Sequence, residues 1–215
     1  MIDAQIKMIK EIAIQIKHFC PDAIVLVVSN PLDVLTYYFQ KETQFPRNKV
    51  IGIASSLDSS RFRYVLSEKL GVNQSYVSDA IVLGEHGDTM VPIFSTAKID
   101  GKNSLELIDS TQQKIISKEI RDYWKSLRHY KSRSQFGIAK NTFDVINSIL
   151  KNNELNIPAS VLLEGEFGEH DVCMGVPVII NKNGISKIKE IKLDESENKS
   201  LHLSAQTIRN YIKSS

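Results

Sequence analysis

Six consecutive apolar residues, Ala23 to Val28, limit most strongly the fold that this chain can adopt. Polar and apolar side chains do not alternate in this run, so a strand formed by it is apolar on both faces. Such strands are typical of the middle of a parallel sheet whose two faces are covered by helices. The run is too short to cross a membrane as a helix, because a span needs about 20 apolar residues.

The segments around this run alternate between helical and strand patterns. Isoleucines at steps of three and four residues predict an amphipathic helix over residues 2–19. A second helix is expected over 32–43, a short buried strand over 49–54 and a third helix over 57–70. This order of helix, strand, helix and strand is typical of a doubly wound parallel sheet.

The second part of the chain is richer in strands, and Asn183-Gly184 is a hairpin signal near its end. We expect the change from parallel α/β to α+β near residue 78, and place a domain boundary between residues 1–77 and 78–215. The expected elements are strands over 78–83, 91–99, 159–164, 172–180 and 185–191, and helices over 104–127, 134–151 and 195–212.

Length and composition exclude several classes of partner. A chain of 215 residues with 42% hydrophobic and 24% charged residues is typical of a soluble globular protein. The net charge is +2 and the basic residues are spread out, so neither nucleic acid nor a membrane surface is an expected partner. Cys20 and Cys173 form no CxxC pair and the N-terminus has no signal-peptide pattern, so we expect a reducing, cytoplasmic location.

His86 is the first candidate for chemistry. It follows the strand expected over 78–83 and lies between Gly84 and Gly87, where an imidazole can face a cleft at the strand end. Asp58 and Arg61 are three residues apart on an expected helix and therefore share one face. Together the three side chains offer a proton carrier, a carboxylate to orient it and a guanidinium for a substrate carboxylate. Taken singly, a structural histidine would explain His86 equally well, and a surface ion pair would explain Asp58 and Arg61 better than a substrate site.

A metal centre is not expected. Glu166, Glu169, His170 and Asp171 lie close together in the sequence, but a solvated turn explains them better than a ligand set.

Several motifs in a fixed order resemble the lactate/malate dehydrogenase family, and malate dehydrogenases of archaeal type in particular. They cover nearly the whole chain and are specific together. The motifs are Val28-Ser29-Asn30-Pro31-Leu32-Asp33, Leu57-Asp58-Ser59-Ser60-Arg61-Phe62-Arg63, Gly84-Glu85-His86-Gly87-Asp88-Thr89-Met90-Val91-Pro92, and Leu163-Glu164-Gly165-Glu166-Phe167-Gly168 followed by Gly175-Val176-Pro177-Val178. The resemblance implies the C-terminal part of a Rossmann-like parallel sheet followed by an α+β catalytic domain.

The resemblance also implies roles for the candidate residues. His86 would exchange a proton with the substrate oxygen, and Asp58 would hold the other ring nitrogen. Arg61 would bind the C1 carboxylate of a small 2-hydroxy or dicarboxylic acid. Ser134 matches a position near the substrate.

A nicotinamide cofactor, NAD or NADP, is implied by the same resemblance. Asn30 would hydrogen-bond the substrate oxygen beside the nicotinamide, and Val28 and Ser29 would line that end of the cofactor site. The resemblance further implies a cis peptide at Asn30-Pro31 and a homo-oligomer.

The sequence contains no G-x-G-x-x-G turn for the cofactor diphosphate. We therefore expect a chain that lacks roughly a hundred residues of the family's first half, at about 30 residues per βαβ unit. Alone it should be unstable or oligomeric and an inefficient enzyme. A malate dehydrogenase is favoured by Thr89-Met90; a lactate dehydrogenase, a non-catalytic oligomerisation partner and one half of a split enzyme stay open as alternatives.

Overall fold

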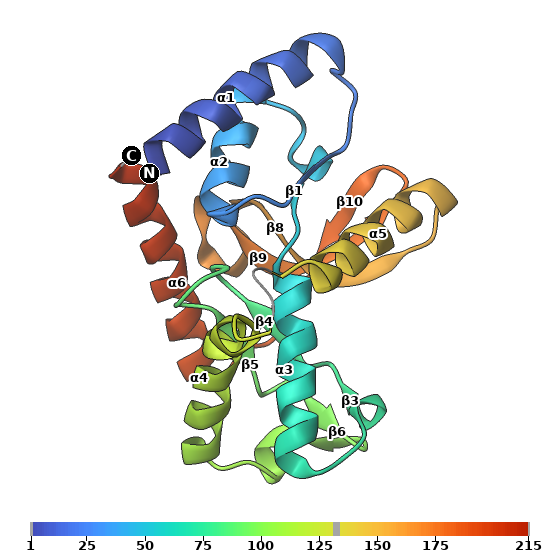
Figure 1. Cartoon of the computed structure of the whole chain (residues 1–215), viewed down its shortest axis with the longest axis vertical. Helices are drawn as coiled ribbons and strands as arrows, with labels where there is room; N and C mark the ends of the chain where they lie inside the picture. The colour runs from blue at the N-terminus through green and yellow to red at the C-terminus, as the bar shows by residue number, and fades with distance from the viewer. Residues whose placement is uncertain (1, 131–133, 215) are drawn as a thin grey trace.

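A mixed sheet of five strands, in the order β1-β2-β8-β9-β10, runs through the molecule (Figure 1). The computed structural model describes residues 2–130 and 134–214. β1 and β2 are parallel and the other neighbours are antiparallel, so one sheet joins the start of the chain to its last third. The strands are β1 (Val25–Val27), β2 (Val50–Gly52), β8 (Leu155–Glu164), β9 (His170–Asn181) and β10 (Gly184–Ile188).

Helices cover this sheet and complete its core. α2 packs on β2, β8 and β9, while α1 lies along α2; α5 packs on β8 and β9, and α6 packs on β9 and α2 (Figure 1). The apolar stripe of α1 buries Ile6, Ile9 and Ala13, as its spacing predicts. The bounds are α1 (Ile2–Phe19), α2 (Leu32–Thr43), α5 (Phe136–Lys151) and α6 (Glu195–Lys213).

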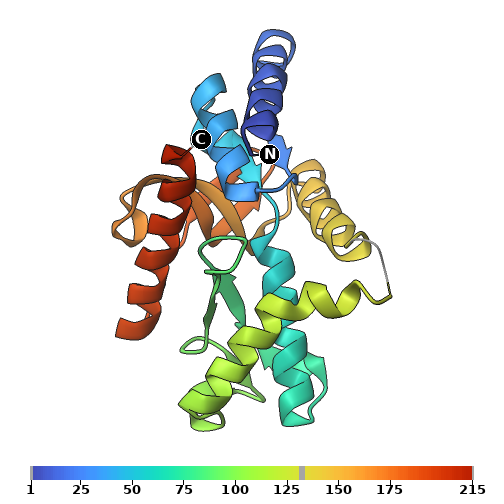
Figure 2. The same cartoon turned by 60° about the vertical axis from the view of Figure 1, so that its left-hand side comes forward.

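A second, smaller core lies away from the sheet. α3 and α4 run side by side there, packed against short strands (Figures 1 and 2). Phe62 of α3 stacks edge-on against Phe94, with ring centroids 5.0 Å apart. The elements are α3 (Ser55–Leu70), β3 (Val77–Ser78), β4 (Ile81–Leu83), β5 (Val91–Ile93), β6 (Lys98–Ile99), β7 (Lys102–Asn103) and α4 (Ser110–Leu127).

The expected fold class is confirmed, and most element bounds agree within a few residues. The hairpin at Asn183-Gly184 and the cis peptide at Asn30-Pro31 are present. The domain boundary between residues 77 and 78 stays a prediction. None of the described helices is both long and apolar enough to span a membrane.

The single strand expected over 91–99 is wrong, because the chain turns there into two strands, β5 and β6, that belong to different sheets. Ser95 bonds through its backbone N–H and its hydroxyl to the carboxylate of Glu197 on α6. A partner about a hundred residues away cannot be read from the local pattern. The helix expected from 104 begins at Ser110, because Asp109 and Gln112 form a capping box.

A close contact between two backbones fastens the end of β4 to the main sheet. Gly84 and Gly175 exchange backbone hydrogen bonds, both 2.9 Å long. A Cβ atom at Gly175 would overlap the hydroxyl of Ser55 and lie 3.1 Å from the Gly84 carbonyl oxygen. Glycine is therefore required at Gly175 for β9 to approach the segment that leads into His86.

Gly175→Ala should lower the free energy of unfolding by about 1–3 kcal/mol, because an added methyl group overpacks this contact. Gly137→Ala on α5 is the matched control: its Cβ would meet only the flexible end of Leu57. The control should be neutral or slightly stabilising, since alanine favours helix over glycine. Urea unfolding measures both variants, and equal stability of the two would contradict the packing argument.

Candidate active site

Most of the candidate residues line one cavity of about 420 Å³, which lies between the carboxyl end of β1, the start of α3, the segment after β4 and one face of α4. A cavity of this size suits a small organic ligand. Its lining includes Val28, Asn30, Leu57, Arg61, His86, Asp88, Arg121, Trp124, Arg128 and Ser134. Chain segments that are far apart in sequence therefore supply one site.

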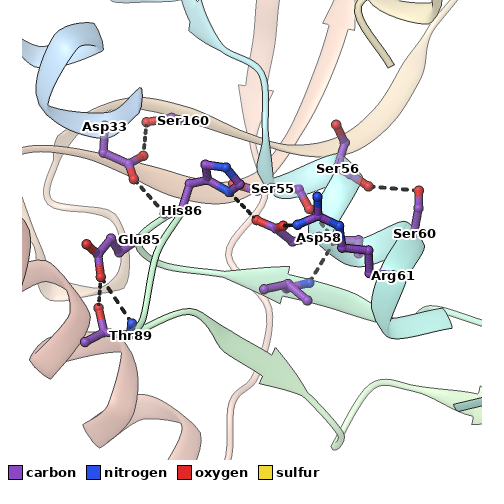
Figure 3. A network of polar contacts seen from close by, with 12 residues as sticks. Asp33, Ser55, Ser56, Asp58, Ser60, Arg61, Glu85, His86, Thr89 and Ser160 are labelled. Atoms are coloured by element: carbon purple, nitrogen blue, oxygen red, sulfur yellow. Dashed lines mark hydrogen bonds and ion pairs between the residues drawn. The ribbon is translucent and has the colours of Figure 1, made fainter. Parts of the chain in front are cut away.

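Asp58 joins the histidine to the arginine. Its Oδ2 lies 2.6 Å from His86 Nδ1, and its Oδ1 accepts a hydrogen bond of 2.9 Å from Arg61 Nη1 (Figure 3). The Asp58 side chain is 1% exposed, whereas 18% of the His86 side chain and 10% of the Arg61 side chain stay exposed. One buried carboxylate thus holds an imidazole and a guanidinium that both face the cavity.

The environment of His86 favours its protonated form. Burial by itself lowers the pKa of the imidazole. The charge and hydrogen bond of Asp58, helped by the charge of Asp33, outweigh burial and raise the pKa of His86 above its usual value. The ring can therefore carry a proton near neutral pH and release it when a neighbouring group takes it.

Asp33 is a further residue at this site, and the sequence analysis did not single it out. Its carboxylate accepts hydrogen bonds of 2.7 Å from the backbone N–H of His86 and from the hydroxyl of Ser160 on β8 (Figure 3). It is 3% exposed, and burial raises its pKa to about 6 even though both bonds oppose that rise. The available signal was an acid in the first turn of a helix that follows a strand end.

The segment after β4 is also tied to α6. The hydroxyl of Ser204 accepts a hydrogen bond of 2.7 Å from the backbone N–H of Glu85. The Glu85 carboxylate in turn accepts from the backbone and hydroxyl of Thr89. These bonds hold the turn that carries His86 at both of its ends.

The residues expected to meet the cofactor lie at the end of β1. Val28 and Asn30 line the cavity, and Val28 is 47% exposed. Ser29 is exposed but is not part of the lining. Val28 and Asn30 are thus open to a ligand in the cavity, whereas none of the chain's 10 glycines forms the G-x-G-x-x-G turn that the diphosphate of the implied cofactor needs.

Among the described residues, no group of three His, Cys, Asp or Glu side chains could hold a metal ion. The solvated turn expected around Glu169 is wrong for that residue. Glu169 is 4% exposed and pairs with His202 and Arg209 of α6, so it joins the turn to the helix. Glu166 pairs with Arg47 at 2.8 Å.

Comparisons with known proteins agree with this geometry. The family model for the lactate/malate dehydrogenase alpha/beta C-terminal domain matches residues 55–215, and the model for the NAD binding domain of the same family matches residues 1–52.

Individual relatives carry both of the family's names. A malate dehydrogenase from Bacteroides fragilis is 35% identical over 210 residues, which are 97% of this chain and 67% of that protein. An L-lactate dehydrogenase from Corynebacterium glutamicum is 34% identical over 218 residues, 99% of this chain and 69% of that protein.

Solved structures give the same result. The malate dehydrogenase from Aeropyrum pernix superposes with a TM-score of 0.93 at 31% identity, over 99% of this chain and 71% of that one. The lactate dehydrogenase from Cryptosporidium parvum, complexed with lactic acid and nicotinamide adenine dinucleotide, has a TM-score of 0.90 at 34% identity, over 98% of this chain and 68% of that one.

Asp33 should make stability depend on pH. Because its pKa is raised from 3.8 to about 6, the folded state holds a proton there between these pH values that the unfolded state has lost. The contribution of Asp33 is therefore fully present below pH 3.8 and is lost as the pH rises through about 6.

Asp33→Asn removes this titration. The unmodified chain should therefore lose up to about 3 kcal/mol of unfolding free energy relative to Asp33→Asn as the pH rises from 3.8 to about 6. Urea unfolding at a series of pH values measures the difference. Asp79→Asn, an exposed acid paired with Lys98, is the control and should leave the slope unchanged; an Asp33→Asn profile parallel to that of the unmodified chain would contradict the assignment.

Proposed function

Because this chain belongs to the lactate/malate dehydrogenase family, we propose that it acts in the NAD-dependent interconversion of malate and oxaloacetate. The observation that carries the proposal is the buried Asp58 carboxylate, which holds His86 and Arg61 at one cavity. The oxidation of a 2-hydroxy acid requires a group that accepts the hydroxyl proton and a group that binds the carboxylate, and the site holds these two groups side by side.

In this proposal His86 moves the proton. Its Nδ1 stays bonded to Asp58, so Nε2 is the atom left to meet the substrate oxygen. When a 2-oxo acid is reduced, Nε2 donates a proton to the carbonyl oxygen, which becomes a hydroxyl; in the other direction it takes that proton back. The negative charge of Asp58 stabilises the ring while it is protonated.

Arg61 binds and orients the acid. One of its nitrogens is bonded to Asp58, and the guanidinium borders the cavity, so its other N–H groups can hold the C1 carboxylate in two parallel bonds. Asn30, which also lines the cavity, donates to the substrate oxygen. Arg61 and Asn30 together would hold the 2-carbon of the substrate beside the imidazole of His86.

Val28, Ser29 and Asn30 would hold the nicotinamide end of NAD. When bound, the nicotinamide gives a hydride to the 2-carbon or accepts one from it. The match to the family's NAD binding domain supports NAD as the cofactor. Because the sequence has no glycine-rich diphosphate turn, we expect the chain alone to bind NADH weakly and to turn over slowly.

L-lactate dehydrogenase is the second candidate, since relatives of both names are about equally similar to this chain. Malate is favoured by Thr89-Met90 after the histidine turn. Asp58, Arg61 and His86 would act in the same way on either substrate, so the proton-transfer mechanism does not depend on the choice.

We also propose a homo-oligomer. α1 and α5 carry large apolar side chains that are 60–79% exposed, among them Phe19, Phe143 and Leu150. Large apolar side chains this exposed on two helices support contacts between chains. The free thiols Cys20 and Cys173 are consistent with a reducing, cytoplasmic location.

Turnover at high NADH tests the proposal. Oxaloacetate should be reduced faster than pyruvate, and His86→Asn should lower the rate by at least about 100-fold, since the positioned proton donor is lost. The absorbance of NADH follows the reaction.

His202→Asn is the matched control, because His202 pairs with Glu169 rather than with Asp58. The control should keep its rate. Equal rates for His86→Asn and the unmodified chain, or no reduction of either acid, would contradict the proposed function; a preference for pyruvate would favour lactate, and rapid turnover at low NADH would contradict the weak binding.

A further inference from the structure

Two buried carboxylates act on His86, and the proposed mechanism uses only one of them. Asp58 bonds the imidazole at Nδ1, whereas Asp33 of α2 accepts a hydrogen bond of 2.7 Å from the backbone N–H of the same residue (Figure 3). Asp33 is 3% exposed and does not line the cavity, so a substrate in the cavity does not touch it. Any effect of Asp33 on the reaction therefore passes through His86.

The place of Asp33 on its helix does not account for its contacts. An acid in the first turn of a helix commonly faces the free N–H groups of that turn. The two oxygens of Asp33 bond other elements instead: Oδ2 accepts from His86, and Oδ1 accepts from the hydroxyl of Ser160 on β8, also at 2.7 Å. Asp33 thus joins α2 and β8 to the turn that carries the imidazole.

The charge of Asp33 needs a reason besides these bonds. Asparagine would offer an acceptor oxygen to the backbone N–H without a charge, and a buried charge is costly. The titratable groups that face Asp33 are His86 and Glu85 from the turn and Cys173 from β9. The charge of Glu85 opposes the ionisation of Asp33, and burial raises the pKa of the Cys173 thiol well above its usual value, which keeps it neutral. Of these three groups, only His86 favours an ionised Asp33.

The effect between Asp33 and His86 is mutual. The charge of Asp33 raises the pKa of His86, and a protonated His86 lowers the pKa of Asp33. Linkage requires this symmetry, since a proton on one group can only change the affinity of the other for its proton by the same factor. The other charges that face His86 are Asp58, which acts in the same direction and more strongly, and Arg61, which opposes both. Asp33 therefore adds to the effect of Asp58 on the ring.

We propose that Asp33 is a second positioning residue of the proton carrier, which fixes the main chain of His86 and stabilises the protonated imidazole by its charge. The inference deepens the proposed function and rests on it, because it takes His86 to be the group that moves the proton. When a 2-oxo acid is reduced, the protonated ring is the reactive form, so an ionised Asp33 keeps His86 reactive to higher pH. When the 2-hydroxy acid is oxidised, the neutral ring is required, and the same charge moves the rise in rate to higher pH.

A pH titration of the His86 ring tests the charge and needs neither substrate nor cofactor. The ¹⁵N shifts of the ring are followed in the unmodified chain and in Asp33→Asn, which keeps an acceptor for the backbone N–H but loses the charge. The midpoint for His86 should fall by about half a pH unit or more in Asp33→Asn. Asp79→Asn, which removes an equal charge from an exposed acid, is the matched control and should leave the midpoint unchanged.

A second variant acts on Asp33 without touching His86. Ser160→Ala removes the hydroxyl that stabilises the ionised carboxylate, so Asp33 keeps its proton to higher pH. The midpoint for His86 should fall in the same direction as in Asp33→Asn, but by less. Backbone amide spectra confirm that each variant retains its fold.

The pH profile of turnover separates the charge from a merely structural role. At high NADH, the rate of oxaloacetate reduction should fall with rising pH at a lower midpoint in Asp33→Asn than in the unmodified chain. Loss of a structural contact alone would lower the rate by the same factor at every pH.

An unchanged midpoint for His86 in both Asp33→Asn and Ser160→Ala would overturn the role of Asp33 and leave the proposed function standing. A rate that falls by the same factor at every pH in Asp33→Asn would overturn it as well. If the unmodified chain reduces neither oxaloacetate nor pyruvate, the proposed function fails, and the role of Asp33 in the reaction fails with it even where the ring titration shows the effect of its charge.

Discussion

The site depends on one buried carboxylate. Asp58 is 1% exposed, and its two oxygens are bonded to His86 and to Arg61. An isolated buried carboxylate is costly, because it loses its hydration. Here the cost is offset by two charged or polarised donors, and each of them is turned toward the cavity by the bond it makes. The same pairing thus keeps the carboxylate stable, orients the imidazole and sets its affinity for a proton.

The turn that carries His86 is held by contacts from elements distant in sequence. Asp33 at the start of α2 accepts a hydrogen bond from the backbone N–H of His86, and Ser204 of α6 accepts one from the backbone N–H of Glu85. Gly84 exchanges backbone hydrogen bonds with Gly175 of β9. None of the side chains that hold the turn in this way is a proposed reacting group. They fix a turn whose own residues form no regular structure, so the position of the imidazole follows from the packing of the main sheet with α2 and α6.

Much of this arrangement follows from local sequence. The unbroken apolar run at Ala23–Val28 predicted a parallel strand, and β1 does pair in parallel with β2, but at the edge of the sheet and not in its middle. Helical spacing placed Asp58 and Arg61 on one face. The split of β5 from β6 and the role of Asp33 did not follow, because their partners, Glu197 and His86, lie far along the chain. Local patterns show which face of an element is apolar, but not which distant polar group forms hydrogen bonds with a turn.

The most direct measurement is the pKa of His86, followed by the ¹⁵N shifts of its ring in the unmodified chain and in Asp58→Asn. If Asp58 governs the site, the pKa of His86 lies above 6.5 in the unmodified chain and is lower in Asp58→Asn, because burial is then opposed only by the smaller effect of Asp33. Backbone amide spectra verify that the variant keeps its fold. A pKa at or below 6.5 in the unmodified chain, or the same pKa in both proteins, would contradict the central role of Asp58.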